Sequence, residues 1–137
     1  MTDVNILLAS AGRRPYLVRW FREAADRLGI SATVILADSD RLAPALATCD
    51  RFIHAPAVNE LEYPQWLEAT LRDHDISLAL SVNDFELSRW AQLPMTEEFN
   101  SLLRLEQKTH EAVEDKLAMD SFLSGQGILT PETILIE

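Results

Sequence analysis

The sequence predicts an α/β fold, a three-layer sandwich in which helices cover both faces of a mostly parallel β-sheet. Two observations support this prediction. Short, nearly continuous apolar runs alternate with amphipathic segments of helical period, and each apolar run ends at turn-forming or polar residues. Continuous apolar runs are typical of parallel strands, because both faces of such strands are buried. The 137 residues, 47% of them hydrophobic, suffice for one domain with an ordinary core.

The first half of the chain begins with a strand and a helix. Residues 4–10 form an apolar run that stops at a turn, so we expect a buried strand there. A helix is predicted over 15–28, because apolar side chains recur at helical spacing between Pro15, which suits a first turn, and Gly29, which suits a C-terminal cap. A second strand, a short helix and a third strand are predicted over 33–37, 43–48 and 51–56.

The second half of the chain continues the alternation and then becomes less regular. The pattern predicts a helix over 63–74, a strand over 77–82 and a helix from Asp84 or Phe85 to about Gln92. Periodicity leaves 93–107 open, since its run "SLLRLE" fits either a strand or the end of a helix. Two further helices and a terminal strand are predicted over 108–114, 116–124 and 132–137.

The predicted domain organisation is one Rossmann-like domain over 1–128, followed at 129–137 by the start of a second domain. A segment with glycine and proline, 125–131, is the candidate hinge. An apolar strand at a chain terminus has an unpaired edge. We therefore expect an excised domain or one half of a split enzyme, and a homodimer could form through pairing of that edge.

Composition excludes several function classes. The formal net charge of −10 repels phosphate backbones and anionic lipid surfaces, so we expect neither nucleic-acid nor membrane binding. The first apolar run is too short for a signal peptide and no run approaches the length of a membrane span. A single cysteine, Cys49, fits a reducing compartment, and the histidines show no metal-ligand spacing. These features predict a cytoplasmic protein.

The loop from Ser10 to Arg14 is the first candidate site. It lies where the first strand passes into the first helix, so free backbone N–H groups and the guanidinium groups of Arg13 and Arg14 could bind a carboxylate or a phosphate. The alternative is a tight turn that uses Gly12 for its backbone freedom, with both arginines solvated. The residues alone favour neither interpretation, because the loop has neither a dinucleotide-binding fingerprint nor a phosphate-binding loop motif.

Acidic and amide side chains follow two other predicted strands. Asp38 could accept hydrogen bonds from ribose hydroxyls, but turn chemistry explains it better. Asn83 or Asp84 could cap the following helix, and Glu86 could complement the dipole of its first turn. In the functional interpretation, Asn83, Asp84 and Glu86 face the same crevice as the arginine loop, where they bind a substrate group or hold that loop in place.

The ordered motifs resemble the N-terminal, pre-ATP-grasp domain of ATP-grasp ligases, in particular the carbamoyl-phosphate-synthase-like members (large-subunit-like). The quoted stretches that carry the resemblance are "NILLASAGRRPYLVRWFREA", "ADSDRLAPALATCDRFIHAP", "SLALSVNDFELSRWA" and "EDKLAMDSFLSGQGILTPET". Each motif is weak alone, but together they cover nearly the whole chain in the family's order.

The resemblance implies an activity for a larger enzyme. Such ligases join a carboxylate to an amine through an acyl-phosphate, with ATP and Mg2+ as cofactors. It also implies that Lys116 contacts the ATP phosphates and that Ser10 to Arg14, Asn83, Asp84 and Glu86 face a small carboxylate or phosphate substrate. The glycine-rich lid and acidic magnesium ligands of the ATP-grasp catalytic domain are absent from this sequence. We therefore expect this chain alone to be inactive and its partner to be that domain.

Two other classes of function remain open on the residues. One is a stand-alone module that binds a small anion or a nucleotide without catalysis. The other is a receiver-like signalling domain, which is disfavoured because it would need an acidic pair after the first strand, where this chain has Ser10 to Arg13.

Overall fold

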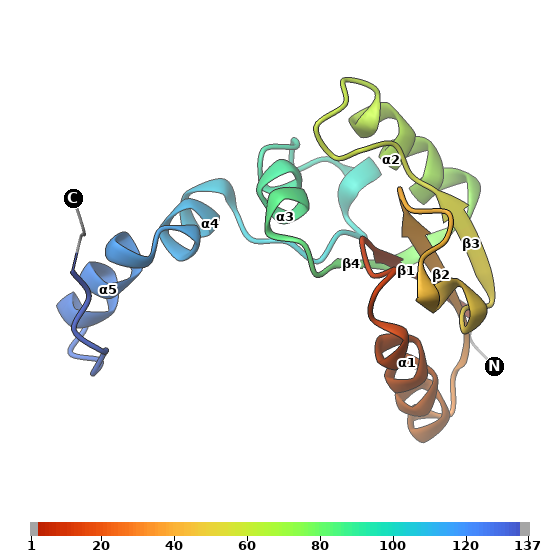
Figure 1. Cartoon of the computed structure of the whole chain (residues 1–137), viewed down its shortest axis with the longest axis horizontal. Coiled ribbons are helices and arrows are strands. Elements are labelled where there is room, and N and C mark those ends of the chain that lie inside the picture. The colour runs from red at the N-terminus through yellow and green to blue at the C-terminus, as the bar shows by residue number, and fades with distance from the viewer. Residues whose placement is uncertain (1–2, 135–137) are drawn as a thin grey trace. The chain divides into compact units, whose positions relative to one another are not determined.

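Four parallel strands form one sheet within the first hundred residues, in a computed structural model that describes residues 3–134 (Figure 1). In sheet order β3-β2-β1-β4, they are β3 (Arg51–His54), β2 (Ser31–Asp38), β1 (Asp3–Ala9) and β4 (Ile76–Ser81). The predicted α/β fold with a parallel sheet is confirmed, and each predicted strand among these four is present within a few residues of its expected bounds.

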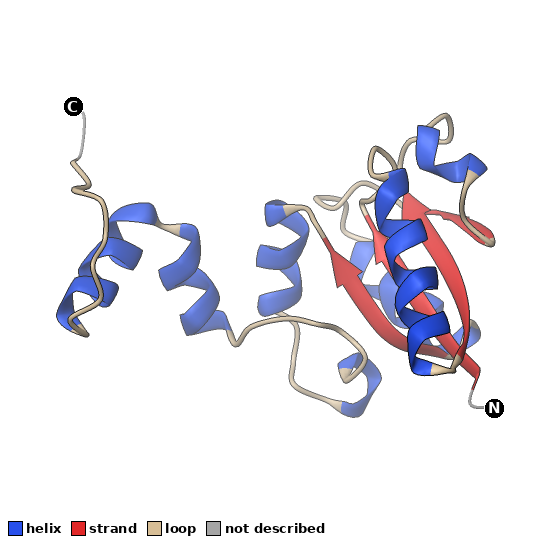
Figure 2. Ribbon diagram, turned by 90° about the horizontal axis from the view of Figure 1, so that it is seen from below, coloured by secondary structure: helices blue, strands red, loops and turns tan. Residues whose placement is uncertain are grey.

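Helices cover both faces of this sheet, as Figure 2 shows. The helices of the first hundred residues are α1 (Pro15–Leu28), α2 (Tyr63–Asp73) and α3 (Asp84–Ala91), with short 3-10 helices η1 (Pro44–Ala47) and η2 (Glu97–Phe99). Helix α1 begins at its proline and ends at Gly29, whose φ of 66° is the left-handed conformation that glycine adopts without strain. Both predicted ends of this helix are confirmed.

The core has two parts because side chains along a strand alternate between the faces of a sheet. On one face, Ile6 and Leu8 of β1 pack with Val18 of α1. On the other face, Leu7 packs with Leu67 of α2, and the same cluster includes Trp90 of α3. This alternation produces the three layers.

The segment 93–107, which periodicity left open, forms no regular strand. After η2 the chain returns to the sheet, where Leu102 makes an isolated parallel bridge with Ala79 of β4. The Ala79 amide donates to the Ser101 carbonyl at 2.7 Å, and the Leu103 amide donates to the Ala79 carbonyl at 2.8 Å. This single bridge extends the sheet beyond β4 by one residue pair.

Residues 1–104 and 105–137 are two separate compact units. The second unit contains α4 (Gln107–Glu114) and α5 (Lys116–Gly125), close to the predicted helices. Of its described side chains, only that of His110 is buried. Residues 132–134 form no strand, and the remainder of the predicted terminal strand, 135–137, lies outside the described residues.

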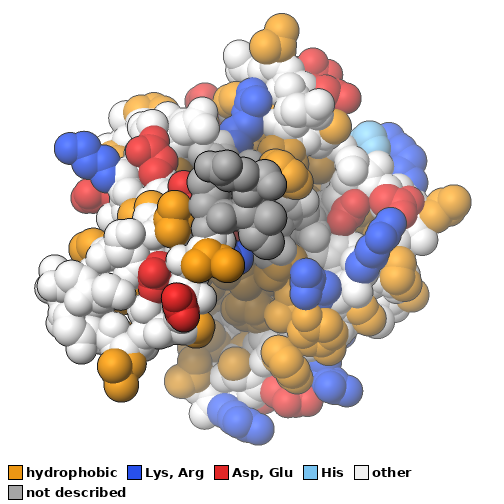
Figure 3. Space-filling model, turned by 60° about the vertical axis from the view of Figure 1, so that its left-hand side comes forward, with side chains coloured by type: hydrophobic (Ala, Val, Ile, Leu, Met, Phe, Trp, Pro, Cys, Tyr) orange, Lys and Arg blue, Asp and Glu red, His pale blue; other side chains and the backbone are white. Residues whose placement is uncertain are grey.

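Charged side chains of both signs are interspersed with hydrophobic ones on the face that Figure 3 shows. None of the helices within residues 3–134 combines the length and the apolar character of a membrane span.

Candidate functional site

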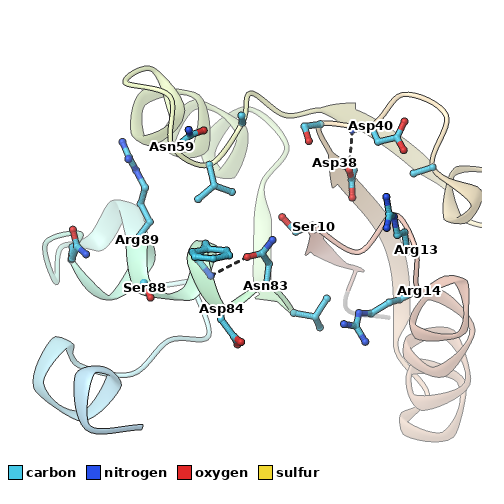
Figure 4. Close-up of a pocket in the computed structure, with 17 residues that line it drawn as sticks. Ser10, Arg13, Arg14, Asp38, Asp40, Asn59, Asn83, Asp84, Ser88 and Arg89 are labelled. Carbon is cyan, nitrogen blue, oxygen red and sulfur yellow. Dashed lines mark hydrogen bonds between the residues drawn. The ribbon is translucent and has the colours of Figure 1, made fainter. Parts of the chain in front are cut away.

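A cleft of about 1080 Å³ opens at the carboxyl ends of β1, β2 and β4 (Figure 4). The chain runs from β1 through β2 to β3 on one side of β1 and then crosses to β4 on the other side, so the strand order reverses at β1. Ligands of open parallel sheets bind at such a reversal of strand order, outside the carboxyl ends of the strands. The volume matches the upper end of small-molecule sites, roughly 300–1,000 Å³.

The structure brings most of the predicted site residues together in this cleft. They come from three connections that are distant in the sequence. Figure 4 shows Arg13 and Arg14 on the side of α1, with Asn83 and Asp84 on the side of α3. The predicted residues that line the cleft are Ser10, Arg13, Arg14, Asp38, Asn83 and Asp84. Gly12 and Glu86, by contrast, are buried and are not part of the lining.

The arginine loop uses some of its backbone donors internally. The Gly12 amide donates to Oδ2 of Asp38 at 2.8 Å, and the Arg14 amide donates to the Ala11 carbonyl at 2.9 Å. Arg13 and Arg14 themselves are exposed, and no acidic residue occurs in the first turn of α1. The positive charge of this wall is therefore carried by guanidinium groups next to the positive end of the helix dipole, a combination that favours an anion.

Asp38 orders the loop that follows β2. Its Oδ2 accepts the Gly12 hydrogen bond, and its Oδ1 accepts a hydrogen bond of 2.9 Å from the amide of Asp40. The second bond is the turn chemistry that the sequence favoured for this residue. Asp38 also lines the cleft, as Arg13 does.

Asn83 is the N-cap of α3. Its Oδ1 accepts hydrogen bonds from the amides of Phe85 at 2.9 Å and Glu86 at 3.3 Å. The backbone amide of Asn83 donates to Oγ of Ser81 at 3.1 Å. The capping interpretation of Asn83 is thus confirmed, and the cap fixes the position of the first helical turn beside the cleft.

Glu86 lies beneath the cleft surface, with 1% of its surface exposed. Tyr63 donates a hydrogen bond to its Oε1, and Ser81 donates one of 2.5 Å to its Oε2. Burial is the main cause that raises the pKa of this carboxyl, and the hydroxyl donors act in the opposite direction. Trp90 in turn donates to the Tyr63 hydroxyl at 3.0 Å. Glu86 therefore joins α2, β4 and α3 under the site.

Sequence reasoning missed one face of α3 that lines the same cleft. Phe85, Ser88, Arg89 and Gln92 follow the spacing i, i+3, i+4, i+7, which puts them on one side of a helix. Helical periodicity could have found this set. Arg89 donates to the Glu60 carbonyl at 3.1 Å, and Figure 4 shows it on the α3 side together with Ser88.

Lys116, the predicted contact of the ATP phosphates, belongs to the second unit. It is exposed and is the first residue of α5. Asp115 caps this helix by accepting hydrogen bonds from the amides of Leu117 at 2.8 Å and Ala118 at 3.0 Å. Lys116 is thereby presented at a well-defined helix start.

Several solved structures share this fold. An L-amino acid ligase from Bacillus licheniformis aligns with a TM-score of 0.61 and 19% identity over 96% of this chain and 32% of its own. An N5-carboxyaminoimidazole ribonucleotide synthetase from Thermotoga maritima aligns with a TM-score of 0.59 and 19% identity, over 96% of this chain and 33% of its own. An N5-carboxyaminoimidazole synthetase from Staphylococcus aureus, complexed with ADP, aligns with a TM-score of 0.53 and 12% identity, over 90% of this chain and 30% of its own.

The identity and coverage values define what this structural likeness shows. The chain spans about a third of the length of those enzymes, and at such identities the likeness shows the fold alone. No curated protein sequence matches the chain significantly.

A family match covers most of the chain. Residues 6–102 match the family described as "PylC-like, N-terminal domain". This span begins in β1 and ends at the bridge formed by Leu102, so it includes every residue that lines the cleft. The chain therefore belongs to the family of PylC-like N-terminal domains, and its resemblance to the N-terminal domains of ATP-grasp ligases is confirmed.

Proposed function

We propose that the chain is the N-terminal substrate-binding domain of an ATP-dependent carboxylate–amine ligase. The observation that carries the proposal is the convergence of Ser10, Arg13, Arg14, Asn83 and Asp84 on one cleft at the reversal of strand order. The family relationship supports the reaction class, and the position of the cleft supports its role as one wall of the substrate site.

The ligand that suits this wall is a small carboxylate or phosphate. Two guanidinium groups from adjacent residues can each present paired N–H donors to the oxygens of such an anion. The chain as a whole carries a net charge of −10, and the field of that charge repels any approaching anion, the ligand included. Recognition therefore depends on Arg13 and Arg14 rather than on the overall charge.

ATP and Mg2+ belong, in this proposal, to the partner ATP-grasp catalytic domain. Within residues 3–134, no group of three or more His, Cys, Asp or Glu side chains is placed to hold a metal ion. Lys116 is the residue of this chain that would reach the ATP phosphates, with the boundary toward the catalytic domain near residue 128. A carbamoyl-phosphate-synthase-like subclass, a cytoplasmic location and a homodimer remain predictions.

Binding of inorganic phosphate and of acetate to the 137-residue chain tests the proposal, with backbone amide shifts followed by NMR. The double variant Arg13→Ala/Arg14→Ala should weaken binding of both anions at least tenfold. The matched control Arg19→Ala/Arg27→Ala removes the same charge from exposed positions of α1 and should leave binding unchanged. Equal losses in the two double variants would show that only overall charge matters, and would contradict the proposed role of the loop.

A stand-alone module that binds a small anion or a nucleotide is the second candidate. It is favoured by one observation, that the cleft is built wholly from residues of the first compact unit. The two candidates differ when a catalytic ATP-grasp domain is supplied. A ligase domain should then support ATP-dependent product formation that the double arginine variant lacks, whereas a module should bind its anion with no effect on ATP turnover.

A further inference from the structure

We propose that the ligand of the cleft is an anion that carries a flat aromatic ring, with the ring against Phe85 and the anionic group at Arg13 and Arg14. This inference rests on the proposed function, because it takes the anion site from it. It adds a second subsite, on α3, that defines the body of the ligand.

The orientation of α3 leaves Phe85 in the cleft. Trp90 is fully buried and Glu86 is 1% exposed, and these two residues, four positions apart, fix the face of the helix that contacts the core. Phe85 lies on the other face, lines the cleft and is 80% exposed. It belongs to neither of the two core clusters, so its ring has no packing role in the described part of the chain.

Two further apolar side chains line the cleft, and the backbone at Phe85 is held by the helix cap. Val58 and Val82 line the same cleft and are half-buried, because each packs against a core cluster. The amide of Phe85 donates to the Asn83 side chain at 2.9 Å, which holds the backbone of the first turn in place. A wall that is already ordered loses little conformational freedom when a ligand binds.

The wall faces the cationic side of the cleft. In Figure 4, Arg13 and Arg14 lie on the α1 side, whereas Asp84, Ser88 and Arg89 lie on the α3 side. A ligand that spans the cleft therefore meets the guanidinium groups of Arg13 and Arg14 at one end, and the Phe85 ring among polar side chains of α3 at the other. This arrangement fits an amphipathic anion better than a small inorganic one.

Two features favour an aromatic ring over an aliphatic chain. A flat ring can stack on Phe85 in the offset geometry that aromatic pairs prefer. Arg89 follows Phe85 by one helical turn on the same face. Its guanidinium donates to the Glu60 carbonyl at 3.1 Å and lies over the Tyr63 ring, 5.9 Å from the ring centroid. A guanidinium group is attracted to the face of an aromatic ring, and a saturated chain offers no such face.

Three phosphates that differ in the attached group test the inference: inorganic phosphate, phenyl phosphate with a flat aromatic ring, and cyclohexyl phosphate with a saturated ring. Their affinities for the 137-residue chain would be measured by NMR titration. We expect phenyl phosphate to bind about tenfold more tightly than inorganic phosphate, with cyclohexyl phosphate in between. Phe85→Ala should reduce the preference for the ring to within about twofold while the affinity for inorganic phosphate stays the same.

Two further variants separate the ring effect from folding and from general hydrophobicity. Phe85→Tyr keeps an aromatic side chain and should keep the preference. Leu28→Ala removes an apolar side chain that is 73% exposed at the opposite end of α1, and it should also keep the preference. Loss of the preference in Leu28→Ala would overturn the assignment to Phe85.

The outcomes also separate this inference from the proposed function. Equal binding of phosphate and phenyl phosphate, with both abolished by Arg13→Ala/Arg14→Ala, would overturn the ring subsite and leave the anion site intact. Cyclohexyl phosphate binding as tightly as phenyl phosphate would overturn the aromatic specificity. Binding of none of the three phosphates would overturn the anion site and the ring subsite together.

Discussion

The backbone amide of Gly12 donates a hydrogen bond of 2.8 Å to the Asp38 carboxylate, and this bond joins the arginine loop after β1 to the end of β2. The two segments approach so closely that a Cβ atom on residue 12 would lie 2.5 Å from both Oδ2 of Asp38 and Cβ of Ala43. The glycine is therefore needed for close approach of two loops that line the cleft.

Gly12→Ala should destabilise the first unit and displace the arginine loop. Overpacking at a site of this kind costs about 1–3 kcal/mol of the free energy of unfolding, and urea denaturation would measure it. Gly125→Ala is the control, since a Cβ there meets nothing within 4 Å. A Gly12→Ala variant as stable as the unmodified chain would contradict the close approach.

Glu86→Gln should change the pH dependence of stability. Burial raises the pKa of the Glu86 carboxyl above its ordinary 4.5, so the folded state holds this proton more tightly than the unfolded state. The resulting stabilisation is complete below pH 4.5 and is lost as the pH rises through the raised pKa, with a slope of at most about 1.4 kcal/mol per pH unit.

The glutamine variant lacks this titration. Relative to the unmodified chain, its free energy of unfolding should therefore increase as the pH rises above 4.5. Denaturation at a series of pH values would measure the difference, with Glu60→Gln, at an exposed position, as the control. Parallel pH profiles for the Glu86→Gln variant and the unmodified chain would contradict a buried carboxyl of raised pKa.

Arg104→Ala should loosen the end of α3. The guanidinium donates to the carbonyls of Trp90 at 2.5 Å, Leu93 at 2.8 Å and Pro94 at 2.7 Å. Loss of hydrogen bonds from a charged donor should lower the free energy of unfolding by about 1.5–3 kcal/mol. Arg104→Lys should recover only part of it, because an ammonium group does not reproduce the planar fork.

Urea denaturation measures both Arg104 variants. Arg72→Ala is the control, because Arg72 is exposed and pairs only with its neighbour Asp73 among the described residues. Its effect should stay within about 0.5 kcal/mol. Full recovery by lysine would show that charge alone, and not the three-carbonyl geometry, stabilises this end of the helix.

Lys116→Ala should weaken ATP binding once the chain is joined to a catalytic ATP-grasp domain. Loss of one ammonium contact to a phosphate should raise KM for ATP about tenfold, because a charged hydrogen bond contributes roughly 1.5–3 kcal/mol. Lys108→Ala is the matched control, since Lys108 is the other lysine of the chain and is also exposed. Equal KM values in the two variants would remove Lys116 from the ATP site.

Local patterns in the sequence predicted the elements of the sheet well. The strand at 33–37 and the helix over 15–28 are confirmed because their apolar spacing, proline and glycine act within a few residues of each other. The segment 93–107 escaped prediction because Leu102 is held by a bridge to Ala79, a contact between positions far apart in the sequence. Local periodicity carries no information about such a contact.

The location of the candidate site was predicted from the sequence, but which of its residues are buried and which are exposed was not. Strand-end position placed Arg13 and Asn83 in one cleft, since the carboxyl ends of parallel strands meet at one edge of a sheet. Glu86 follows the same strand end, yet it is buried, because the rotation of α3 is fixed by the burial of Trp90. The same rotation exposes Phe85, which the sequence reasoning did not select.

The sequence by itself determined the succession of strands and helices along the chain, because this depends on periodicity and caps. It also determined the edge of the sheet where polar side chains gather, because this depends on chain direction. The tertiary structure decided which of those side chains face the cleft. Helix rotation and loop approach are set by packing between distant segments, such as Gly12 against Asp38 and Trp90 against the core, and no local pattern encodes them.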